Sequence, residues 1–459
     1  MPNAVTQPYG GYHHGEVPAP DLELTQVGPG TPGGEYLRRF WHPIGLSAGL
    51  NDLPKRIRVL GEDLVLFRDG RGEIGLLDLH CSHRGTSLEF GMVQRCGIRC
   101  CYHGWVYDVD GRVLETPGEP TESTYKDRFY HAAYPTIEYK GMIFTYMGPP
   151  ELRPEFPIFD SFELPGYRMF PGGTTDERYI YDCNWLQLAE NNGDVVHFVF
   201  LHYPEDARTR LNRYRPSANP EASLEDYFGV GQGEWETELR TIVDDFRPRV
   251  VEWQVTPTGV MSIHTRRVGE LVWIRLGDYM MPNVDQFAPT SLVPNEELEF
   301  GPPYMTAWTV PVDDTHTMSF QFRYVREEVA REPRASALRT SESVDRTYHD
   351  RQREPGDYEA QESQRSIAVH AREHLATTDQ GVIFVRKLLR EGIQAVQRGE
   401  DPRRVVPGAG LTIPTYCRNT VLRIPPAATP EADRELLRST ARERVAALLA
   451  RSAQPAMSV

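Results

Sequence analysis

The chain has little cysteine, little excess positive charge and no long apolar run, and each shortage excludes a class of protein. Six cysteines in 459 residues are too few for a scaffold held together by disulfides. The acidic residues outnumber the basic ones and give a formal net charge of −15, which argues against nucleic acid and anionic lipid as partners. No run of about 18 apolar residues occurs, so we expect no membrane-spanning helix.

Two further signals are missing. Residues 1–34 have neither the basic nor the apolar segment of a secretory signal peptide, so we expect no export by that route. No G-x-G-x-x-G opens a helix after a strand-like run, and this motif is the usual mark of a dinucleotide-binding unit. The chain therefore has no evident NAD(P)H site, and any nicotinamide nucleotide would act through another protein.

Cysteine and histidine are instead concentrated in two short segments, 81–83 and 100–103, which read C-x-H and C-x2-H. Structural zinc sites usually group their ligands as C-x2-4-C and H-x3-5-H, whereas each segment here mixes one Cys with one His. This mixed set is typical of a Rieske 2Fe–2S cluster, in which two Cys hold one iron and two His hold the other. We favour the cluster over zinc, with these ligands: Cys81, His83, Cys100 and His103.

A second metal site is indicated between 184 and 202, where an apolar helical pattern contains Asp194-x2-His197-x4-His202. Residues three apart share one face of a helix, but residues five apart diverge by about 140°. His197 and His202 can therefore bind one ion only if the helix is distorted, and we place that irregularity at 198–200. Two His and one carboxylate form the facial triad of non-haem Fe(II) oxygenases.

The third ligand must come from elsewhere in the chain. Asp357 is the preferred candidate, because it opens a helical pattern over 357–374 and a helix N-terminus could present it. Spacing alone leaves four rivals: Asp345, Asp350, Glu359 and Asp379. Glu190 and Asn191 lie on the same apolar helix as the first histidine, and burying that many polar groups costs several kcal/mol unless they are paired or bound to a metal.

The pattern along the chain predicts an α+β protein of three parts. Residues 1–34 are rich in Gly and Pro and read as an extended, poorly packed arm. Residues 35–155 show short strands with turn dipeptides and read as a small all-β domain, while 156–459 read as an antiparallel sheet with helices. Helices are expected at 184–201, 357–374, 379–398 and after Thr429, and the polar stretch 203–247 is interpreted as a lid.

The cluster motif followed by Asp-x2-His-x4-His resembles the catalytic α-subunit of Rieske non-haem iron ring-hydroxylating oxygenases. The segments 100–105 and 373–379 look like the phthalate-type branch, which includes aromatic-acid dioxygenases and O-demethylases. The resemblance implies a Rieske 2Fe–2S domain joined to a helix-grip catalytic domain. It also implies that Asp357 completes the iron site and that Asp194 bridges the iron of one subunit and the cluster of its neighbour.

The function so implied is that of a terminal oxygenase. It would use O2 and single electrons to hydroxylate or O-demethylate a small, acidic aromatic substrate at Fe(II) in a cytoplasmic homotrimer. The electrons would come from a flavin and iron–sulfur reductase, with or without a ferredoxin. Three arginines on expected strands could bind the acidic group: Arg266, Arg267 and Arg275. The alternative is a Rieske electron carrier without oxygenase chemistry, which would leave the residues after the cluster domain unexplained.

Overall fold

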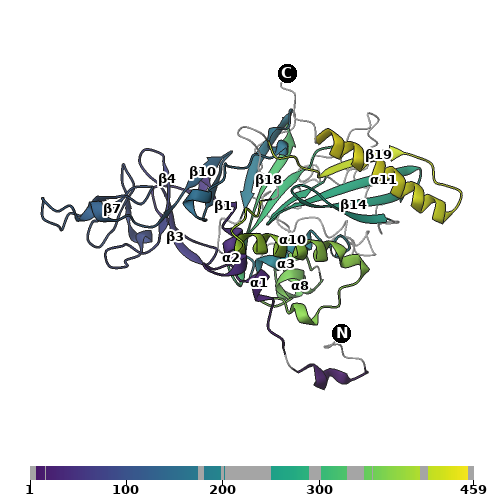
Figure 1. The fold of residues 1–459 in the computed structure, drawn as a ribbon, viewed down its shortest axis with the longest axis horizontal. Coiled ribbons are helices and arrows are strands. Elements are labelled where there is room, and N and C mark those ends of the chain that lie inside the picture. Colours follow the sequence, from purple (N-terminus) through teal and green to yellow (C-terminus); the bar gives the residue numbers. More distant parts are fainter. Residues whose placement is uncertain are drawn as a thin grey trace.

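The protein is elongated, with a small β domain at one end of its long axis and a large sheet with helices across the other (Figure 1). The computed structural model describes residues 7–15, 17–173, 180–197, 201, 250–288, 301–327, 346–353, 355–403 and 412–452. The predicted α+β class is confirmed. Within these ranges no helix combines the length and the apolar character needed to cross a bilayer. The positions of the domain boundaries at 34 and 155 remain a prediction.

The small domain consists of three antiparallel sheets, and short strands separated by tight turns account for it. The first sheet has the order β1-β11-β10, with β1 at Trp41–Leu46, β10 at Thr136–Tyr139 and β11 at Met142–Tyr146. The second has the order β2-β3-β4-β9: Lys55–Val59, Glu62–Arg68, Ile74–Asp78 and Ala133–Tyr134. The third, at the outer end in Figure 1, has the order β5-β6-β7-β8: Met92–Val93, Ile98–Arg99, Val106–Tyr107 and Val113–Glu115.

The large sheet is antiparallel and has the order β12-β18-β17-β16-β15-β14-β13. Its strands are Tyr167–Gly173 (β12), Val250–Val255 (β13), Gly259–Val268 (β14), Leu271–Met280 (β15), Val284–Phe287 (β16), Met305–Asp313 (β17) and His316–Arg326 (β18). Beyond the point where β16 ends, β19 (Arg418–Arg423) pairs with the first part of β15. The sequence predicts strands around 178–182, 250–256, 260–266, 270–276, 305–311 and 317–324. The last five coincide with β13, β14, β15, β17 and β18, whereas Tyr181 forms an isolated bridge with Thr317 and the described residues 180–182 belong to no strand.

The helices cover the two faces of this sheet unequally. Apolar residues of β14 and β15 pack under α11 (Pro430–Ser452), through Leu437, Ala441 and Val445. On the opposite face, the indole of Trp253 lies close to Gly381 in α10 (Gln380–Gln397). The remaining described α-helices are short: α1 at Leu22–Thr25, α2 at Pro32–Leu37, α3 at Trp185–Asn191, α8 at Tyr348–Arg353 and α9 at Asp357–Glu362.

The expected arm at 1–34 is packed in its second half, contrary to the prediction. Leu24 and Val27 are fully buried in the main core, and Trp185 of α3 donates its indole N–H to the carbonyl of Leu24. Gly33 and Gly34 allow this, because a Cβ at either would collide with main-chain atoms of residues 23–28. Gly and Pro thus serve close packing here as well as chain flexibility.

Two helix predictions also need correction. The helix expected over 184–201 ends at Asn191, and a turn at Asn192–Gly193 precedes a new helical turn at His197. The cause is close packing, since a Cβ on Gly193 would lie only 3.0 Å from main-chain atoms of Gly381 and Val382. The expected helix over 357–374 is confined to α9, followed by a 3-10 turn at His370–Arg372. Residues 198–200, where we placed the irregularity, and the proposed lid at 203–247 lie outside the described residues.

Candidate metal centres

The two cysteine–histidine segments form loops with the same main-chain hydrogen bonds. In the first, the N–H of Cys81 donates to Thr86 O (2.9 Å) and that of Gly85 donates to Cys81 O (2.8 Å). In the second, Cys100 N–H donates to Trp105 O (2.8 Å) and Gly104 N–H to Cys100 O (3.1 Å). Both turns need a residue with positive φ at the fourth position after Cys, and Gly85 (φ 77°) and Gly104 (φ 73°) supply it.

These loops bring the four candidate cluster ligands together. Cys81 and Cys100 are 3 % and 2 % exposed and belong to one apolar cluster, whereas the rings of His83 and His103 lie 4.4 Å apart nearer the surface. Burial raises the pKa of the Cys81 thiol, and the neighbouring Cys100 adds to the rise. Two adjacent buried thiols without a disulfide are the kind of site that metal binding stabilises. The donor set therefore fits a 2Fe–2S cluster.

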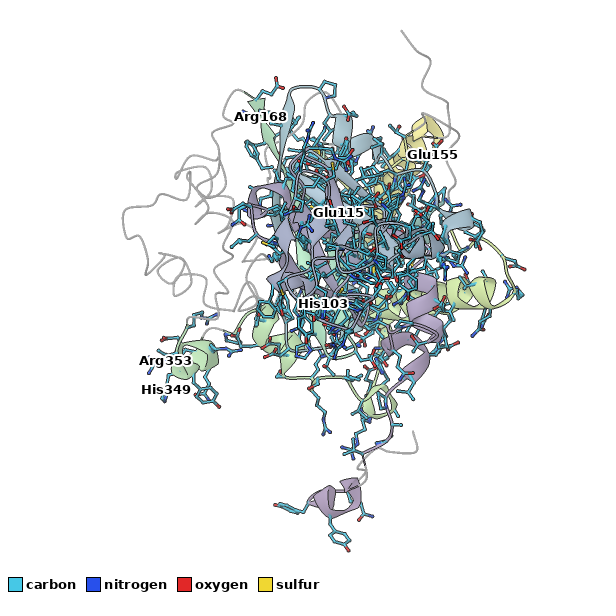
Figure 2. All side chains as sticks on the ribbon, turned by 90° about the vertical axis from the view of Figure 1, so that its left-hand side faces the viewer. His103, Glu115, Glu155, Arg168, His349 and Arg353 are labelled. Atoms are coloured by element: carbon cyan, nitrogen blue, oxygen red, sulfur yellow. The ribbon has the colours of Figure 1, made fainter. Side chains whose placement is uncertain are left out.

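The position of this site in the molecule suits electron exchange with another protein. The indole of Trp105 stacks against His83 with the ring centroids 4.6 Å apart and the planes 3° from parallel, which fixes the imidazole at the surface. Figure 2 looks along the long axis from the β7 end, where His103 is labelled. The cysteines face the interior and the histidines face outward, so the histidine edges are the exposed route to a cluster.

The second centre brings together three predicted residues from separate segments. His197 Nε2 lies 3.8 Å from Asp357 Oδ1, and the amide nitrogen of Asn191 lies 3.3 Å from His197 Nε2 and 3.2 Å from Asp357 Oδ1. Ligand atoms sit about 2.0–2.2 Å from a first-row metal ion, so two ligands of one ion can be up to about 4.4 Å apart. The pair His197 and Asp357 therefore fits a mononuclear metal.

Asp194 is placed differently from the sequence prediction. Its Oδ1 accepts the main-chain N–H groups of Val196 (2.9 Å) and His197 (3.2 Å), so it caps the new helical turn rather than sharing a helix face with the histidine. His197 Nδ1 lies against the carbonyl oxygen of Asp194, while Oδ2 of the carboxylate is 4.0 Å away. A carbonyl only accepts, so Nδ1 carries the proton and Nε2 is left as the ligand atom facing Asp357.

The other candidate ligands have different environments. His202 and Asp345 lie outside the described residues. Asp350 accepts from Thr347, Glu359 pairs with Arg351 at 2.6 Å, and the carboxylate of Asp379 caps the main chain at Ala376. Asp357 is thus the candidate carboxylate that the described structure brings to His197.

A third group of potential ligands lies near α3 but is organised as an ion-pair network. One donor atom each from Glu190, His370 and Glu373 lie within 4.8 Å of one another. The guanidinium of Arg386 occupies this space and donates to both carboxylates, from Nε and Nη2 to Glu190 and from Nη1 and Nη2 to Glu373. Burial raises the pKa of Glu190 to about 7, although Arg386 opposes the rise. A cation already fills the site, so we assign it to helix anchoring and not to a metal.

The sequence pattern did not identify several residues that lie around the two centres. Tyr107 and His131 lie beside the cysteine loops, and Tyr304 directly precedes β17, near the second centre. A lone Tyr or His in a β domain is more often a core residue than a functional one. Only their proximity in the folded chain identifies them.

The comparisons with known proteins agree with this geometry. Residues 40–129 match the family model of the Rieske [2Fe-2S] domain. The chain is 40 % identical over 438 residues (92 % of this chain, 87 % of the relative) to the oxygenase subunit of a tert-butanol monooxygenase / tert-amyl alcohol desaturase of Aquincola tertiaricarbonis. It is 34 % identical over 410 residues (86 % and 89 %) to the α-subunit of phenoxybenzoate dioxygenase of Ectopseudomonas oleovorans.

The structural comparison gives the same fold. The structure of NdmA of Pseudomonas putida CBB5, as a QL mutant with theobromine, superposes with a TM-score of 0.55 at 20 % identity, covering 83 % of this chain and 100 % of that one. The fold and the two centres define an oxygenase that combines a Rieske cluster with a mononuclear iron. The chain belongs to the family of Rieske non-haem iron oxygenases, as an oxygenase subunit. It accordingly carries one 2Fe–2S cluster and one mononuclear iron.

The assignment of the Arg386 network can be tested by removing the guanidinium. Arg386→Met leaves the side chains of Glu190 and Glu373, 12 % and 27 % exposed, without their cation. We expect the free energy of unfolding to fall by about 3 kcal/mol, the usual cost of breaking a buried pair from one side. The measurement is denaturant unfolding of the purified protein. Adding Glu190→Gln should recover part of the loss, because the buried charge is then removed.

Lys387→Met is the matched control for this prediction. Lys387 is the next residue of α10, is 66 % exposed and lies 3.9 Å from the carboxylate of Glu391. Its replacement should change stability little. A free energy of unfolding in Arg386→Met equal to that of the wild type would contradict the anchoring role.

Proposed function

We propose that the two loops hold the cluster and that His197, His202 and Asp357 hold the catalytic iron. The shared main-chain turns and the adjacent buried sulfurs support the cluster ligands: Cys81, His83, Cys100 and His103. The observation that carries the iron site is the 3.8 Å approach of His197 Nε2 to Asp357 Oδ1, from segments far apart in the chain. His202 enters from the sequence motif.

When bound, the cluster supplies single electrons and the iron binds O2 beside the substrate. The residues of the chain bind, orient and exclude water around these groups. The Asp194 carbonyl fixes the tautomer of His197. The Asn191 amide lies beside both proposed ligands, and this amide would still donate to the Asp357 carboxylate once His197 Nε2 gives its lone pair to iron. Such support keeps ligand geometry fixed through a reaction cycle.

We further propose that Asp194 links the iron site to the cluster of a second copy of the chain. The loops with the cluster ligands lie at the outer end of the small β domain, whereas α3 and its following turn lie under the large sheet (Figure 1). The Asp194 side chain is 33 % exposed, and its Oδ2 is not one of the atoms that cap the turn. It can therefore accept a hydrogen bond from a neighbour's imidazole. A homotrimer is the arrangement we propose for this contact.

We propose a flavin and iron–sulfur reductase, directly or through a ferredoxin, as the electron donor. The outward-facing His83 and His103 support a docking route for such a partner at the β7 end. The six cysteines carry no disulfide, which favours the reducing cytoplasm as the place of action. Iron and acid-labile sulfide analysis, with the visible spectrum of the purified protein, tests the whole assignment against a cluster-only electron carrier.

The substrate we propose is a small aromatic acid that is hydroxylated or O-demethylated. Burial raises the pKa of Tyr304 and Asp357 adds to the rise, whereas Arg275 and Arg323 oppose it, so these groups surround one tyrosine. Arg275 lies opposite His264 in the β14–β15 pair, on the face where α10 packs. Two guanidinium groups close to the proposed iron ligand favour an anionic substrate. The phenoxybenzoate-acting relative is consistent with this proposal.

A small tertiary alcohol is the second candidate. The 40 % identical relative is named for tert-butanol and tert-amyl alcohol. Among the described residues, none bonds to Nε2 of the buried His264, and burial holds the pKa of this histidine well below the usual value. A neutral imidazole could bind a hydroxyl group as well as a carboxylate. Product analysis with benzoates, phenoxybenzoates, methoxybenzoates and tert-butanol, using a reconstituted reductase, separates the two classes.

Of the three arginines predicted to bind the acidic group, Arg267 is excluded by its position. Its guanidinium pairs with Asp433 of α11 and is 6 % exposed, so it faces the other side of the sheet. Arg266 lies on the face of the sheet where α10 packs, with its guanidinium 4.9 Å from the centre of the Trp273 ring. Arg275 donates from Nε and Nη2 to the carbonyl of Ala288, and it is the preferred contact for a substrate carboxylate.

The iron-site proposal predicts that Asp357→Ala loses mononuclear iron and turnover but keeps the visible spectrum of the cluster. The reason is that the two centres have separate ligands. Asp379→Ala is the control, since its carboxylate caps a 3-10 turn, and it should keep both metal centres. Metal analysis with electron paramagnetic resonance measures this. Full iron occupancy in Asp357→Ala would refute the assignment.

The bridging proposal predicts that Asp194→Asn keeps both centres but oxidises its reduced cluster very slowly. An asparagine oxygen can still accept the N–H groups of Val196 and His197, so the turn should persist. The charge and half of the acceptor capacity are lost. Single-turnover stopped flow of pre-reduced enzyme, with substrate and O2, follows the cluster's visible bands. Reoxidation at the wild-type rate would reduce Asp194 to a capping residue.

The substrate proposal predicts different effects of Arg275→Gln on two substrate classes. For an aromatic acid, loss of one charged hydrogen bond of about 1.5–3 kcal/mol should raise KM roughly tenfold to a hundredfold. Turnover of a neutral tertiary alcohol should stay nearly constant. Arg423→Gln is the control, because this arginine is 67 % exposed on β19. Equal effects on both classes, or turnover of alcohols alone, would contradict an acid-binding role.

A further inference from the structure

A buried histidine that belongs to neither ligand set lies directly behind the first cysteine loop. His131 precedes β9 and is 3 % exposed. Its main-chain N–H donates to Gly111 O at 2.7 Å, and the backbones approach so closely that a Cβ on Gly111 would collide with the carbonyl of His131. The main chain of His131 is therefore held against the turn between β7 and β8, where Gly111 lies.

The ring nitrogens of His131 lie near Ser82, the residue between the proposed ligands Cys81 and His83, and near Asp78. His131 Nε2 lies 2.9 Å from the carbonyl oxygen of Asp78, and Nδ1 lies 2.6 Å from the hydroxyl of Ser82. A carbonyl can only accept, so Nε2 carries the proton and Nδ1 accepts from Ser82. Burial lowers the pKa of His131, against the opposing effect of the Asp78 carbonyl, and favours this neutral form.

A second residue of the site, Tyr107, stacks on the face of the same imidazole. The rings of His131 and Tyr107 stack with centroids 4.4 Å apart and planes 29° from parallel. The Tyr107 hydroxyl lies 3.0 Å from Cys81 Sγ. Burial raises the pKa of Tyr107 and the Cys81 hydrogen bond adds to the rise, so the phenol keeps its proton. A cysteine that binds iron is a thiolate, and the hydroxyl must then be the donor.

These contacts form a closed ring of four residues: Cys81, Ser82, His131 and Tyr107. Cys81 and Ser82 are joined by a peptide bond, Ser82 donates to His131, His131 stacks on Tyr107, and Tyr107 reaches Cys81. Removing any member loosens the position of the phenol relative to the sulfur. The ring lies entirely within the described part of the small β domain and involves no ligand histidine.

We propose that His131 is a positioning residue that sets the reduction potential of the cluster. It does so by holding Ser82 and the Tyr107 hydroxyl in place against Cys81. A hydrogen bond to a cluster sulfur stabilises the additional negative charge of the reduced state, so the potential rises with the strength of that bond. This inference rests on the proposed function, because it takes Cys81 to be a cluster ligand.

The experiment compares single variants of the whole holoenzyme by spectroelectrochemistry of the visible bands. Tyr107→Phe removes the bond to sulfur and should lower the midpoint potential most. His131→Phe keeps a ring for Tyr107 to stack on but loses both ring hydrogen bonds, and Ser82→Ala removes the same bond from the other side. Each should lower the potential by a smaller amount. The double variant Ser82→Ala/His131→Phe should lower the midpoint potential by no more than the larger of its two single shifts. The reason is that both substitutions remove the same hydrogen bond between Ser82 and His131.

Ser87→Ala is the matched control. Ser87 lies in the same loop, where its hydroxyl caps a 3-10 turn at Glu89, and its loss should leave the potential unchanged. If Ser82→Ala and His131→Phe retain the wild-type potential while Tyr107→Phe lowers it, or if their shifts add, the proposal is overturned. Should His131→Phe fail to fold, Ser82→Ala alone decides the outcome. A wild-type protein without a 2Fe–2S spectrum would instead overturn the proposed function.

Discussion

The iron centre depends on the close approach of two main-chain segments at Gly193 and Gly381. A side chain at either position would collide with the backbone of the other. Because both are glycines, α3 ends against the start of α10 and the chain turns before Asp194. That turn directs His197 Nε2 toward Asp357 and leaves Asn191, at the end of α3, between the two. Backbone packing thus sets the spacing between the proposed ligands.

The same helices are held from the other side by charge. Arg386 of α10 pairs with Glu190, the neighbour of Asn191 in α3, and with Glu373, which precedes α10. The pairs are largely shielded from solvent, so each carboxylate depends on the guanidinium for compensation. Contact at the glycines sets how closely the two helices approach, and the ion pairs hold them together. The rigidity that a metal site needs is therefore built before any metal binds.

The kind of chemistry at each centre could be predicted from the sequence because most candidate ligands lie in short local motifs, whereas Asp357 could only be preferred among several acidic residues far from His197 in the chain. Cys81 and His83 lie in one loop, and the long strands of the sheet follow simple alternation. The end of α3 could not be predicted, since it results from contact with Gly381, almost two hundred residues away in the chain. Burial of the arm followed no local signal either, because Gly33 and Gly34 read as flexible until their neighbours are known.

The arginines of the sheet show the same limit in another form. Adjacent residues of a strand face opposite sides of a sheet. Arg266 and Arg267 therefore cannot both lie on the face where α10 packs, and no local pattern says which one does. The partner decides: Asp433 of α11 compensates Arg267 on one face, while Arg266 lies over Trp273 on the other. A buried guanidinium must meet an acid or an aromatic ring, so the helices that cover each face select the arginine available to a substrate.

The two centres are held by different means, and their tasks require this difference. A cluster that gains and loses one electron should move little between its two states. Its loops are accordingly closed by identical main-chain bonds, with the sulfurs buried and Trp105 packed on His83. An iron that must admit O2 and substrate needs open positions, and its proposed ligands His197 and Asp357 come from separate segments of the chain. The proposed cluster ligands that reach the surface are histidines, and the exposed group beside the proposed iron ligand is the Asp194 carboxylate. An imidazole N–H and a carboxylate are complementary as donor and acceptor, so the contact that would join the two centres can form between copies as a charge-assisted hydrogen bond.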